Sequence, residues 1–146
     1  MVVTDIIINE IMYQPIEGNE YIEIYNRSTH PIDFEGWQIN EWEIPSIILN
    51  PEDYLVLCKD YQDLIAYYGN ISGEVKELNT ITLKNTGDTI RLISKDGFIF
   101  DEVIYEGDNT ERGRSLERVN PDIPSDVQDN WGECLNDAGG TPGERN

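Results

Sequence analysis

Residues 20–26, which read EYIEIYN, show the pattern that decides the fold of this chain. Ile22 and Ile24 fall on one side of an extended segment, whereas Glu20 and Glu23 fall on opposite sides. This pattern predicts a strand with one buried face and one semi-polar face. The run before it, IIINEIM at residues 6–12, predicts a second strand with a local irregularity at its polar pair.

Short strand-like segments continue outward from this pair and alternate with turn signals. The Asp96-Gly97 dipeptide predicts a two-residue hairpin between two of them. One helix is expected near residues 60–68, with Asp60 as its N-cap and Gly69 as its stop. Turn signals every 8–12 residues indicate an all-β sandwich of about nine strands, and the further segments expected to be extended are 32–39, 42–44, 47–49, 54–58, 80–83, 89–94, 98–105 and 115–118.

Composition supports this fold class and excludes others. The 146 residues suit one domain, and 20 Ile against 2 Ala favour strands over helices. The net charge of −19 argues against nucleic acid as a partner, because phosphate contacts need clustered Lys and Arg. No apolar run is long enough for membrane insertion. We expect the chain to be a piece excised from a longer protein, with any targeting signal outside it.

Few residues suggest chemistry. His30, the only histidine, precedes a proline and is expected in an exposed turn, and no nucleophile elbow is present, so we predict no catalytic residues and no enzyme. One histidine also excludes a Cys/His zinc site. Cys58 and Cys134 are either small buried thiols or a disulfide between the middle and the end of the chain.

Acidic residues gather in two loops, and calcium is the cation they would suit, although the order of an EF-hand is missing. The alternative is a pair of solvated acidic loops, and no cofactor is otherwise predicted. The candidate calcium ligands are Asp122, Asp126 and Asp129 in one loop, and Asp101, Glu102, Glu106 and Asp108 in the other.

Aromatic and charged side chains suggest structural roles. Trp37 and Trp131 are expected in the core, whereas Tyr21 and Tyr25 could form a partner-binding strip or a second packing layer. For the ionic groups, we expect a cross-strand pair among Glu10, Glu23 and Arg91. Arg114 and Arg118 are expected to fix the segment between them to acidic neighbours.

Several of these segments, taken in order, resemble the lamin tail domain family from about Ile6 to Asn146. They are INEIMY at 8–13, EYIEIYN at 20–26, IDFEGW at 32–37, NTGDTIRL at 85–92, the Asp96-Gly97 hairpin, SLER at 115–118, Asn130-Trp131 and GTPG at 140–143; the last three resemble the bacterial branch. The residues that carry the resemblance as structural positions are Asn9, Glu10, Glu23, Gly36, Trp37, Gly87, Asp88, Ser115, Arg118, Trp131, Gly140, Pro142 and Gly143.

The resemblance implies a single immunoglobulin-like β-sandwich domain over residues 1–146. It implies a non-catalytic interaction or spacer module of a bacterial secreted or surface protein, located outside the cell or on its surface. Its partner would be another protein or a neighbouring domain of the parent chain. The alternative is a surface module that binds carbohydrate or adheres through calcium. Residues 49–78, with their helix, depart from the most compact form of the family.

Overall fold

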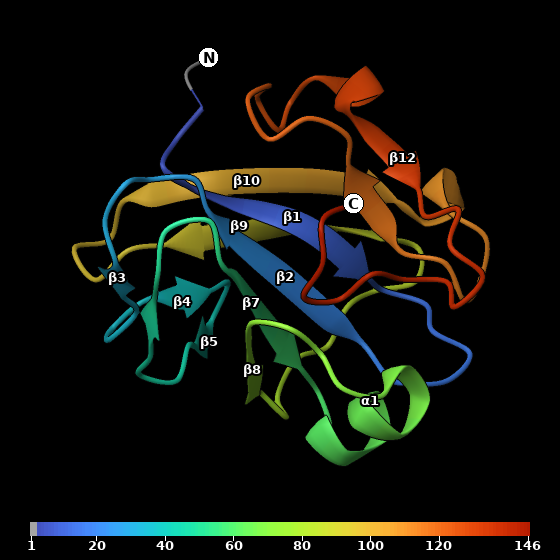
Figure 1. Ribbon diagram of the computed structural model, residues 1–146. Helices are drawn as coiled ribbons and strands as arrows, with labels where there is room; N and C mark the ends of the chain where they lie inside the picture. The colour runs from blue at the N-terminus through green and yellow to red at the C-terminus, as the bar shows by residue number, and fades with distance from the viewer. Residues whose placement is uncertain (1–2) are drawn as a thin grey trace.

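The alternating segments form the strands of two facing sheets in the computed structural model, which describes residues 3–146 (Figure 1). Six strands, in the order β12-β11-β1-β2-β7-β8, make the larger sheet, and β10-β9-β4-β5 make the second. The larger sheet contains β1 (Ile6–Met12), β2 (Tyr21–Asn26), β7 (Tyr54–Cys58), β8 (Glu74–Glu77), β11 (Leu116–Arg118) and β12 (Trp131–Glu133). The second contains β4 (Gln38–Ile39), β5 (Trp42–Glu43), β9 (Gly87–Ile93) and β10 (Ile99–Glu106), while β3 (Ile32–Asp33) pairs with β6 (Ile48–Leu49).

The core lies between the sheets and confirms the predicted all-β sandwich. Alternate residues of β1 and β2 point inward and meet alternate residues of β9 and β10. All of the following are buried in one cluster: Ile6, Ile8, Ile22, Ile24, Ile90, Leu92 and Val103. Trp37 lies in this cluster and Trp131 packs against it, as expected.

The described residues form twelve strands rather than about nine. Residues 80–83, expected as a strand, form none: Ile81 and Leu83 are buried by packing, without a ladder. In contrast, β8 was not expected, because its sequence EVKE has a single apolar residue. It pairs in parallel with β7. A parallel pair needs a crossover, and α1 (Tyr61–Tyr68) supplies it.

The predicted signals at both ends of the helix are confirmed. The Asp60 side chain accepts the Asp63 N–H at 3.1 Å, and the Gly69 N–H closes the last turn on the Ile65 carbonyl at 2.8 Å. Gly69 has φ +76°, a conformation that glycine adopts without strain. The Asp96-Gly97 turn joins β9 to β10 as predicted, but its loop has three residues rather than two, because the Ser94 N–H donates to the Phe98 carbonyl at 2.8 Å. No helix among residues 3–146 has the length and apolar character needed to cross a membrane.

The outer face of β2 is buried, and the expected semi-polar face is therefore wrong. Tyr21 and Glu23 are both fully buried. Two elements cover them: Leu64 of α1 packs into a second cluster with Tyr21, and Gly143 near the end of the chain donates to Glu23. The alternation of apolar and polar residues does not by itself predict that both faces of a strand are covered.

Candidate functional site

A groove of about 1100 Å³ lies between β10 and residues 124–131, which lead through the short 3₁₀ helix η2 (Gln128–Asn130) into β12. In Figure 1, β10 runs along the top of the molecule beside β1, and the chain between β11 and β12 rises above it. Ile7 of β1, Leu116 and Trp131 provide an apolar part of the lining. The groove is therefore assembled from residues 3–7, near the start of the chain, and from three segments between residues 99 and 131.

β10 presents apolar side chains to solvent at this groove. Ile104 is 68% exposed and Ile99 is 56% exposed, although both line it. Ile104 lies on the same outward face as Glu102 and Glu106, whereas Val103 and Tyr105 point into the core. An isoleucine between two carboxylates on the outer face of a strand is the one signal in the sequence that could have indicated this surface.

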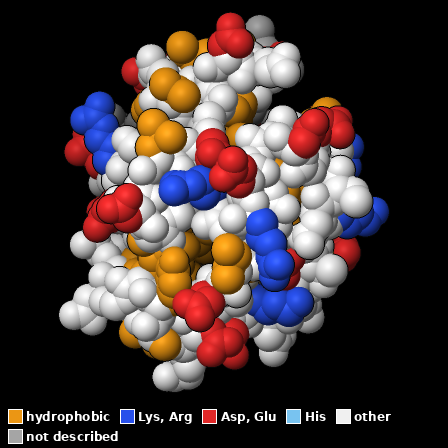
Figure 2. Space-filling view, turned by 90° about the vertical axis from the view of Figure 1, so that its right-hand side faces the viewer, with side chains coloured by type: hydrophobic (Ala, Val, Ile, Leu, Met, Phe, Trp, Pro, Cys, Tyr) orange, Lys and Arg blue, Asp and Glu red, His pale blue; other side chains and the backbone are white. Residues whose placement is uncertain are grey.

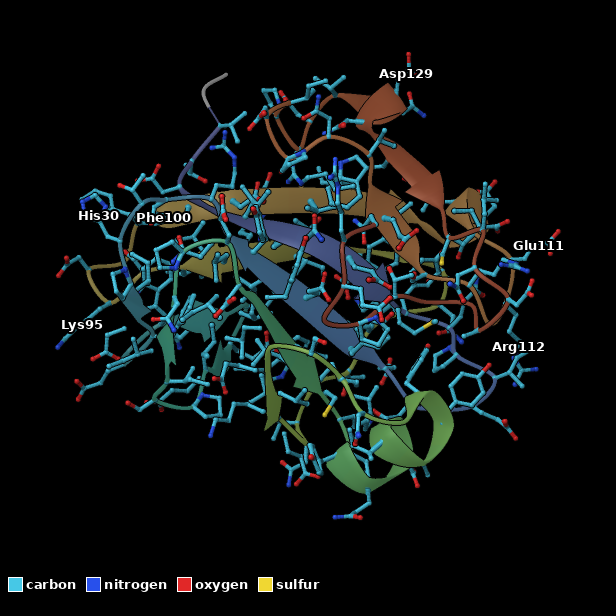
Figure 3. The ribbon with its side chains drawn as sticks, in the orientation of Figure 1. His30, Lys95, Phe100, Glu111, Arg112 and Asp129 are labelled. Atoms are coloured by element: carbon cyan, nitrogen blue, oxygen red, sulfur yellow. The ribbon has the colours of Figure 1, made fainter. Side chains whose placement is uncertain are left out.

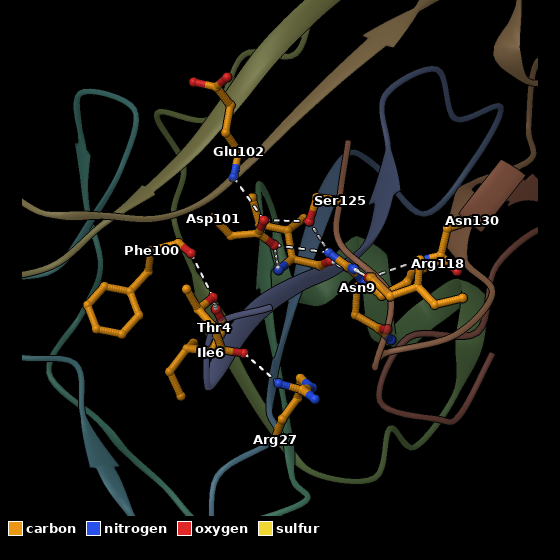
Figure 4. Close-up of polar contacts among 12 residues, drawn as sticks. Thr4, Ile6, Asn9, Arg27, Phe100, Asp101, Glu102, Arg118, Ser125 and Asn130 are labelled. Carbon is orange, nitrogen blue, oxygen red and sulfur yellow. Dashed lines mark hydrogen bonds and ion pairs between the residues drawn. The ribbon is translucent and has the colours of Figure 1, made fainter. Parts of the chain in front are cut away.

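A buried polar network holds the two walls of the groove together (Figure 4). The Asp101 carboxylate of β10 lies 3.1 Å from the Arg118 guanidinium of β11 and accepts the Ile8 N–H of β1 at 2.8 Å. Arg118 also donates to the carbonyl oxygens of Ile8 at 3.0 Å and Ile123 at 2.7 Å. Ser125 bonds to both Asp101 and Arg118.

Trp131 completes this network. Its indole N–H donates to the Ser125 carbonyl at 2.8 Å, and the Arg118 guanidinium lies 4.9 Å from the centre of its ring. The Arg118 side chain is fully buried and that of Asp101 is 9% exposed. Burial raises the pKa of Asp101, partly offset by its bonds to Ser125, Ile8 and Arg118, while burial lowers the pKa of Arg118. The predicted contact of Arg118 with an acidic neighbour is confirmed.

The charge around the groove is negative. Among residues 3–146, its lining includes five carboxylates and neither Lys, Arg nor His. Asp101 is paired with Arg118, and Glu102 with Arg91 at 2.6 Å. The other three carboxylates form no ion pair within residues 3–146 and are exposed: Glu106, Asp126 and Asp129.

The predicted calcium clusters are not assembled. In the part of the chain that the structure describes, no three His, Cys, Asp or Glu residues converge as metal ligands. Asp122, expected to act with Asp126 and Asp129, instead pairs with Arg27 at 2.8 Å. Asp108 lies in the 3₁₀ helix η1 (Gly107–Asn109) and is exposed. Four of these carboxylates are exposed to solvent, as the alternative expected: Glu106, Asp108, Asp126 and Asp129. The other three are ion-paired, which was not expected from the sequence: Asp101, Glu102 and Asp122.

The outer edge of β10 has no strand partner among the described residues, since β10 ends its sheet. The Gly107 N–H donates to the Thr86 carbonyl at 3.1 Å, one position beyond the last β9–β10 pair. Opposed residues of an antiparallel ladder alternate between bonded and non-bonded pairs. Glu102 and Ile104 therefore direct their backbone N–H and C=O groups away from β9.

A second buried polar site lies on the outer face of β1 and β2. Glu10 and Glu23 oppose each other across the ladder, and both are 0% exposed. Neither forms an ion pair within residues 3–146. The expected pair with Arg91 is wrong, because Arg91 points outward from β9 in the other sheet and binds Glu102.

Neutral donors surround the two carboxylates. Glu10 Oε2 accepts bonds from the Tyr21 hydroxyl, from the Ser115 hydroxyl at 2.7 Å and from the Thr141 N–H at 2.9 Å. Glu23 accepts the Asn9 amide at 2.9 Å and the Gly143 N–H at 2.6 Å. Burial raises the pKa of Glu10 to about 7 and, together with the Glu10 charge, raises that of Glu23 well above its usual value.

Residues 139–143, which we call the C-terminal strap, lie over this site. A Cβ atom at Gly140 would overlap the Tyr21 hydroxyl and lie 2.9 Å from the Tyr68 hydroxyl. Pro142 and Gly143 are also buried. Of the remaining positions in the resemblance, Gly36 has φ +80° and Gly87 has φ +127°, while Asp88 accepts the Thr89 N–H at 2.8 Å.

The remaining candidates have structural or solvent-exposed positions. His30 is exposed and lies at the opposite end of the molecule from Glu111 and Arg112 (Figure 3). Tyr21 is buried and Tyr25 packs on Tyr54 with ring centres 4.8 Å apart, so they form packing layers rather than a strip.

The last candidate residues from the sequence are Arg114 and the two cysteines. Arg114 donates to the carbonyl oxygens of Cys134 at 2.8 Å and Asn136 at 2.9 Å, and its expected contact with acidic neighbours is wrong. Cys58 and Cys134 are separate buried thiols rather than a disulfide. Burial raises their pKa values to about 12 and about 11, so neither is a nucleophile at neutral pH.

Together, the two sheets and the loop-walled groove define an immunoglobulin-like β-sandwich module. The chain belongs to the lamin tail domain family, whose model matches residues 2–107. This family is a non-catalytic structural domain. No curated protein matches the sequence. The match ends before residues 108–146, so β11, β12, the outer wall of the groove and the C-terminal strap all lie beyond it.

Proposed function

We propose that this lamin tail domain is a non-catalytic module that binds another protein, or a neighbouring domain of its parent chain, in the groove beside β10. The observation that carries the proposal is the exposed apolar side chain of Ile104, on an edge strand that borders a preformed groove. Exposed apolar surface beside a groove is typical of interaction sites. The Asp101–Arg118 network supports binding, because walls that are already fixed lose little entropy when a partner docks.

We place the module in a bacterial secreted or surface protein. Support comes from the resemblance of residues 115–118, 130–131 and 140–143 to the bacterial branch of the family, and from the net charge of −19, which suits a soluble surface. A module that served only as a spacer would not need the groove.

On the face shown in Figure 2, Lys and Arg are interspersed with carboxylates and apolar side chains, and this mixture does not favour the binding of nucleic acid there.

Neither enzymatic activity nor carbohydrate binding is favoured by the groove. Among the described residues, the groove lining has neither His nor Cys, and the Ser125 hydroxyl bonds to Asp101, a carboxylate that is already ion-paired with Arg118. Sugar rings stack on exposed aromatic faces, but the ring of Trp131 is half-buried and lies against Arg118. Protein binding is therefore the function that the geometry supports best.

The test compares two substitutions of exposed isoleucines. Ile104→Glu alters the groove, and Ile48→Glu alters β6, where Ile48 is 61% exposed and outside the groove lining. A protein captured from the host's secreted and surface fraction is purified, and its affinity is measured by calorimetry. We expect Ile104→Glu to weaken binding at least about tenfold and Ile48→Glu less than about twofold. Equal affinities for both variants and the wild type would refute a role for the groove.

A further inference from the structure

We propose that the occupant of the groove is an extended protein segment with alternating basic and apolar side chains, which adds to β10 as a further strand. This inference rests on the proposed function and specifies the chemistry of the partner. Three independent observations support it: the unpaired backbone edge of β10, the apolar positions along the groove and the charge of its rim.

The backbone edge supplies the hydrogen bonds. Of the groups that point away from β9, the Phe100 carbonyl accepts the Thr4 hydroxyl at 2.6 Å, and the Glu106 carbonyl accepts the Tyr13 hydroxyl at 3.2 Å. Between these two anchors, the N–H and C=O groups of Ile104 have no partner within residues 3–146, nor does the carbonyl of Glu102. An extended peptide that pairs with an exposed strand edge obtains affinity from such groups.

The apolar residues of the groove lining determine where the bound segment needs apolar side chains. Strand side chains point to opposite faces in turn, so every second residue of an added strand faces the same way. Ile104 shares the outward face of β10 with Glu102 and Glu106, whereas Ile7, Leu116 and Trp131 lie deeper in the lining. Apolar side chains at alternate positions of the segment would pack there, which favours small or branched apolar residues with a period of two.

The charge selects basic residues at the other positions. Glu106, Asp126 and Asp129 line the groove, are exposed and have no cationic partner among the described residues. Lys or Arg side chains would neutralise them, whereas an acidic segment would be repelled. The same repulsion disfavours a second copy of this chain, since pairing β10 with β10 would bring Glu102 and Glu106 of both copies together.

The experiment uses four designs of synthetic peptide, each eight residues long, and the third design is made in two versions. The first is acetyl-KVKIKVKV-amide. The second replaces each Lys with Glu. The third keeps the first sequence but has N-methyl groups on alternate backbone nitrogens, in two versions of opposite phase. The fourth has the same composition with its four Lys together. Binding is measured by calorimetry at low salt, and the contact is mapped from the amide signals of the isotope-labelled domain by nuclear magnetic resonance.

We expect the first peptide to bind with one-to-one stoichiometry and to slow the hydrogen exchange of the Ile104 amide. The acidic peptide, the Lys-block peptide and one N-methylated version should each bind at least about tenfold more weakly. Equal binding by both N-methylated versions would overturn strand addition, and equal binding by the acidic or Lys-block peptide would overturn the charge pattern. A dimer that protects the Ile104 amide without peptide would show that a second copy is the occupant.

The two proposals fail separately. If the purified partner loses affinity with Ile104→Glu while none of the peptides binds, the groove is an interaction site for a partner of different chemistry. If Ile104→Glu leaves the affinity of the partner unchanged, the proposed function itself fails. Because Ile104 is 68% exposed, the variant is expected to fold, which its circular dichroism spectrum checks.

Discussion

Two buried carboxylate sites tie the segment beyond residue 107 to the matched part of the family, and they do so by opposite means. At the groove, Asp101 faces the Arg118 guanidinium at 3.1 Å. Under the C-terminal strap, Glu10 and Glu23 face each other and are surrounded by hydroxyl, amide and backbone N–H donors.

The difference lies in how the negative charge is neutralised. A buried ion pair is stable as long as both partners are present, whatever the pH near neutrality. A buried pair of carboxylates without a cation holds a proton instead, because two adjacent charges cannot both be ionised cheaply in a low-dielectric interior. The groove site therefore depends on one arginine, whereas the strap site depends on pH.

The largest expected effect comes from removing that arginine. Arg118→Met leaves Asp101 buried without its cation and removes the bonds to Ile8 and Ile123. The free energy of unfolding should fall by about 3–5 kcal/mol, measured by urea denaturation. Arg91→Met is the matched control: its pair with Glu102 is largely exposed and should contribute less than about 1 kcal/mol. Similar losses in the two variants would show that Arg118 is not the fixing residue of the groove.

The strap site should make stability fall as pH rises. Glu10 has a pKa raised to about 7 from an ordinary 4.5, so the folded state holds a proton that the unfolded state releases between these values. The stabilisation is complete below about pH 4.5 and is lost as pH rises through about 7, a change on the order of 3 kcal/mol. Glu23, also raised, acts in the same direction.

Glu10→Gln tests this pH dependence. The amide oxygen can accept the bonds from Ser115 and Thr141 without any charge. Between pH 5 and 8, the variant should therefore lose less stability than the wild type in urea titrations, and at pH 8 it should be the more stable of the two. Parallel pH profiles for the two proteins would mean that Glu10 is ionised throughout.

The sequence predicts the groove site and the strap site unequally. The strands and their alternation follow from residues such as Ile22 and Ile24, because period-two burial is a local property. The burial of Glu23 does not, because it depends on Gly143, which is 120 positions away. For the same reason, the expected ion pair with Arg91 was wrong. The charges are opposite, but Arg91 lies in the other sheet.

The groove was beyond prediction for a related reason. Its lining comes from β1, β10, β11 and the loop before β12, and no pattern within one segment encodes how four segments converge. Asp101 and Asp126 were recognised as acidic loop positions, but their roles differ: Asp101 is paired with Arg118, and Asp126 has no ion pair within residues 3–146. Only the arrangement in space separates a structural carboxylate from one available to a partner.

A smaller effect is expected from crowding the C-terminal strap. Gly140→Ala would place a methyl group against the hydroxyls of Tyr21, which is fully buried, and of Tyr68, which is half-buried against the second cluster. The cost should be about 1–3 kcal/mol of unfolding free energy. Gly132→Ala is the control, since its Cβ would be 3.9 Å from the nearest atom, at Val119. If both variants have the same free energy of unfolding as the wild type, the strap can shift away from the two tyrosines without a loss of stability.

The smallest effect should come from salt, and it separates the surface from the two buried sites. Residues 3–146 contain four ion pairs, so most of the 29 acidic side chains have no cation nearby and repel one another. Screening should raise the urea midpoint when sodium chloride is increased from low salt to about 0.5 M. The corresponding gain in the free energy of unfolding should be less than about 1 kcal/mol. Because buried pairs are screened much less, Arg118→Met should show the same salt increment as the wild type. A flat or falling midpoint would mean that the surface carboxylates are paired or liganded, contrary to the free rim on which basic-segment binding depends.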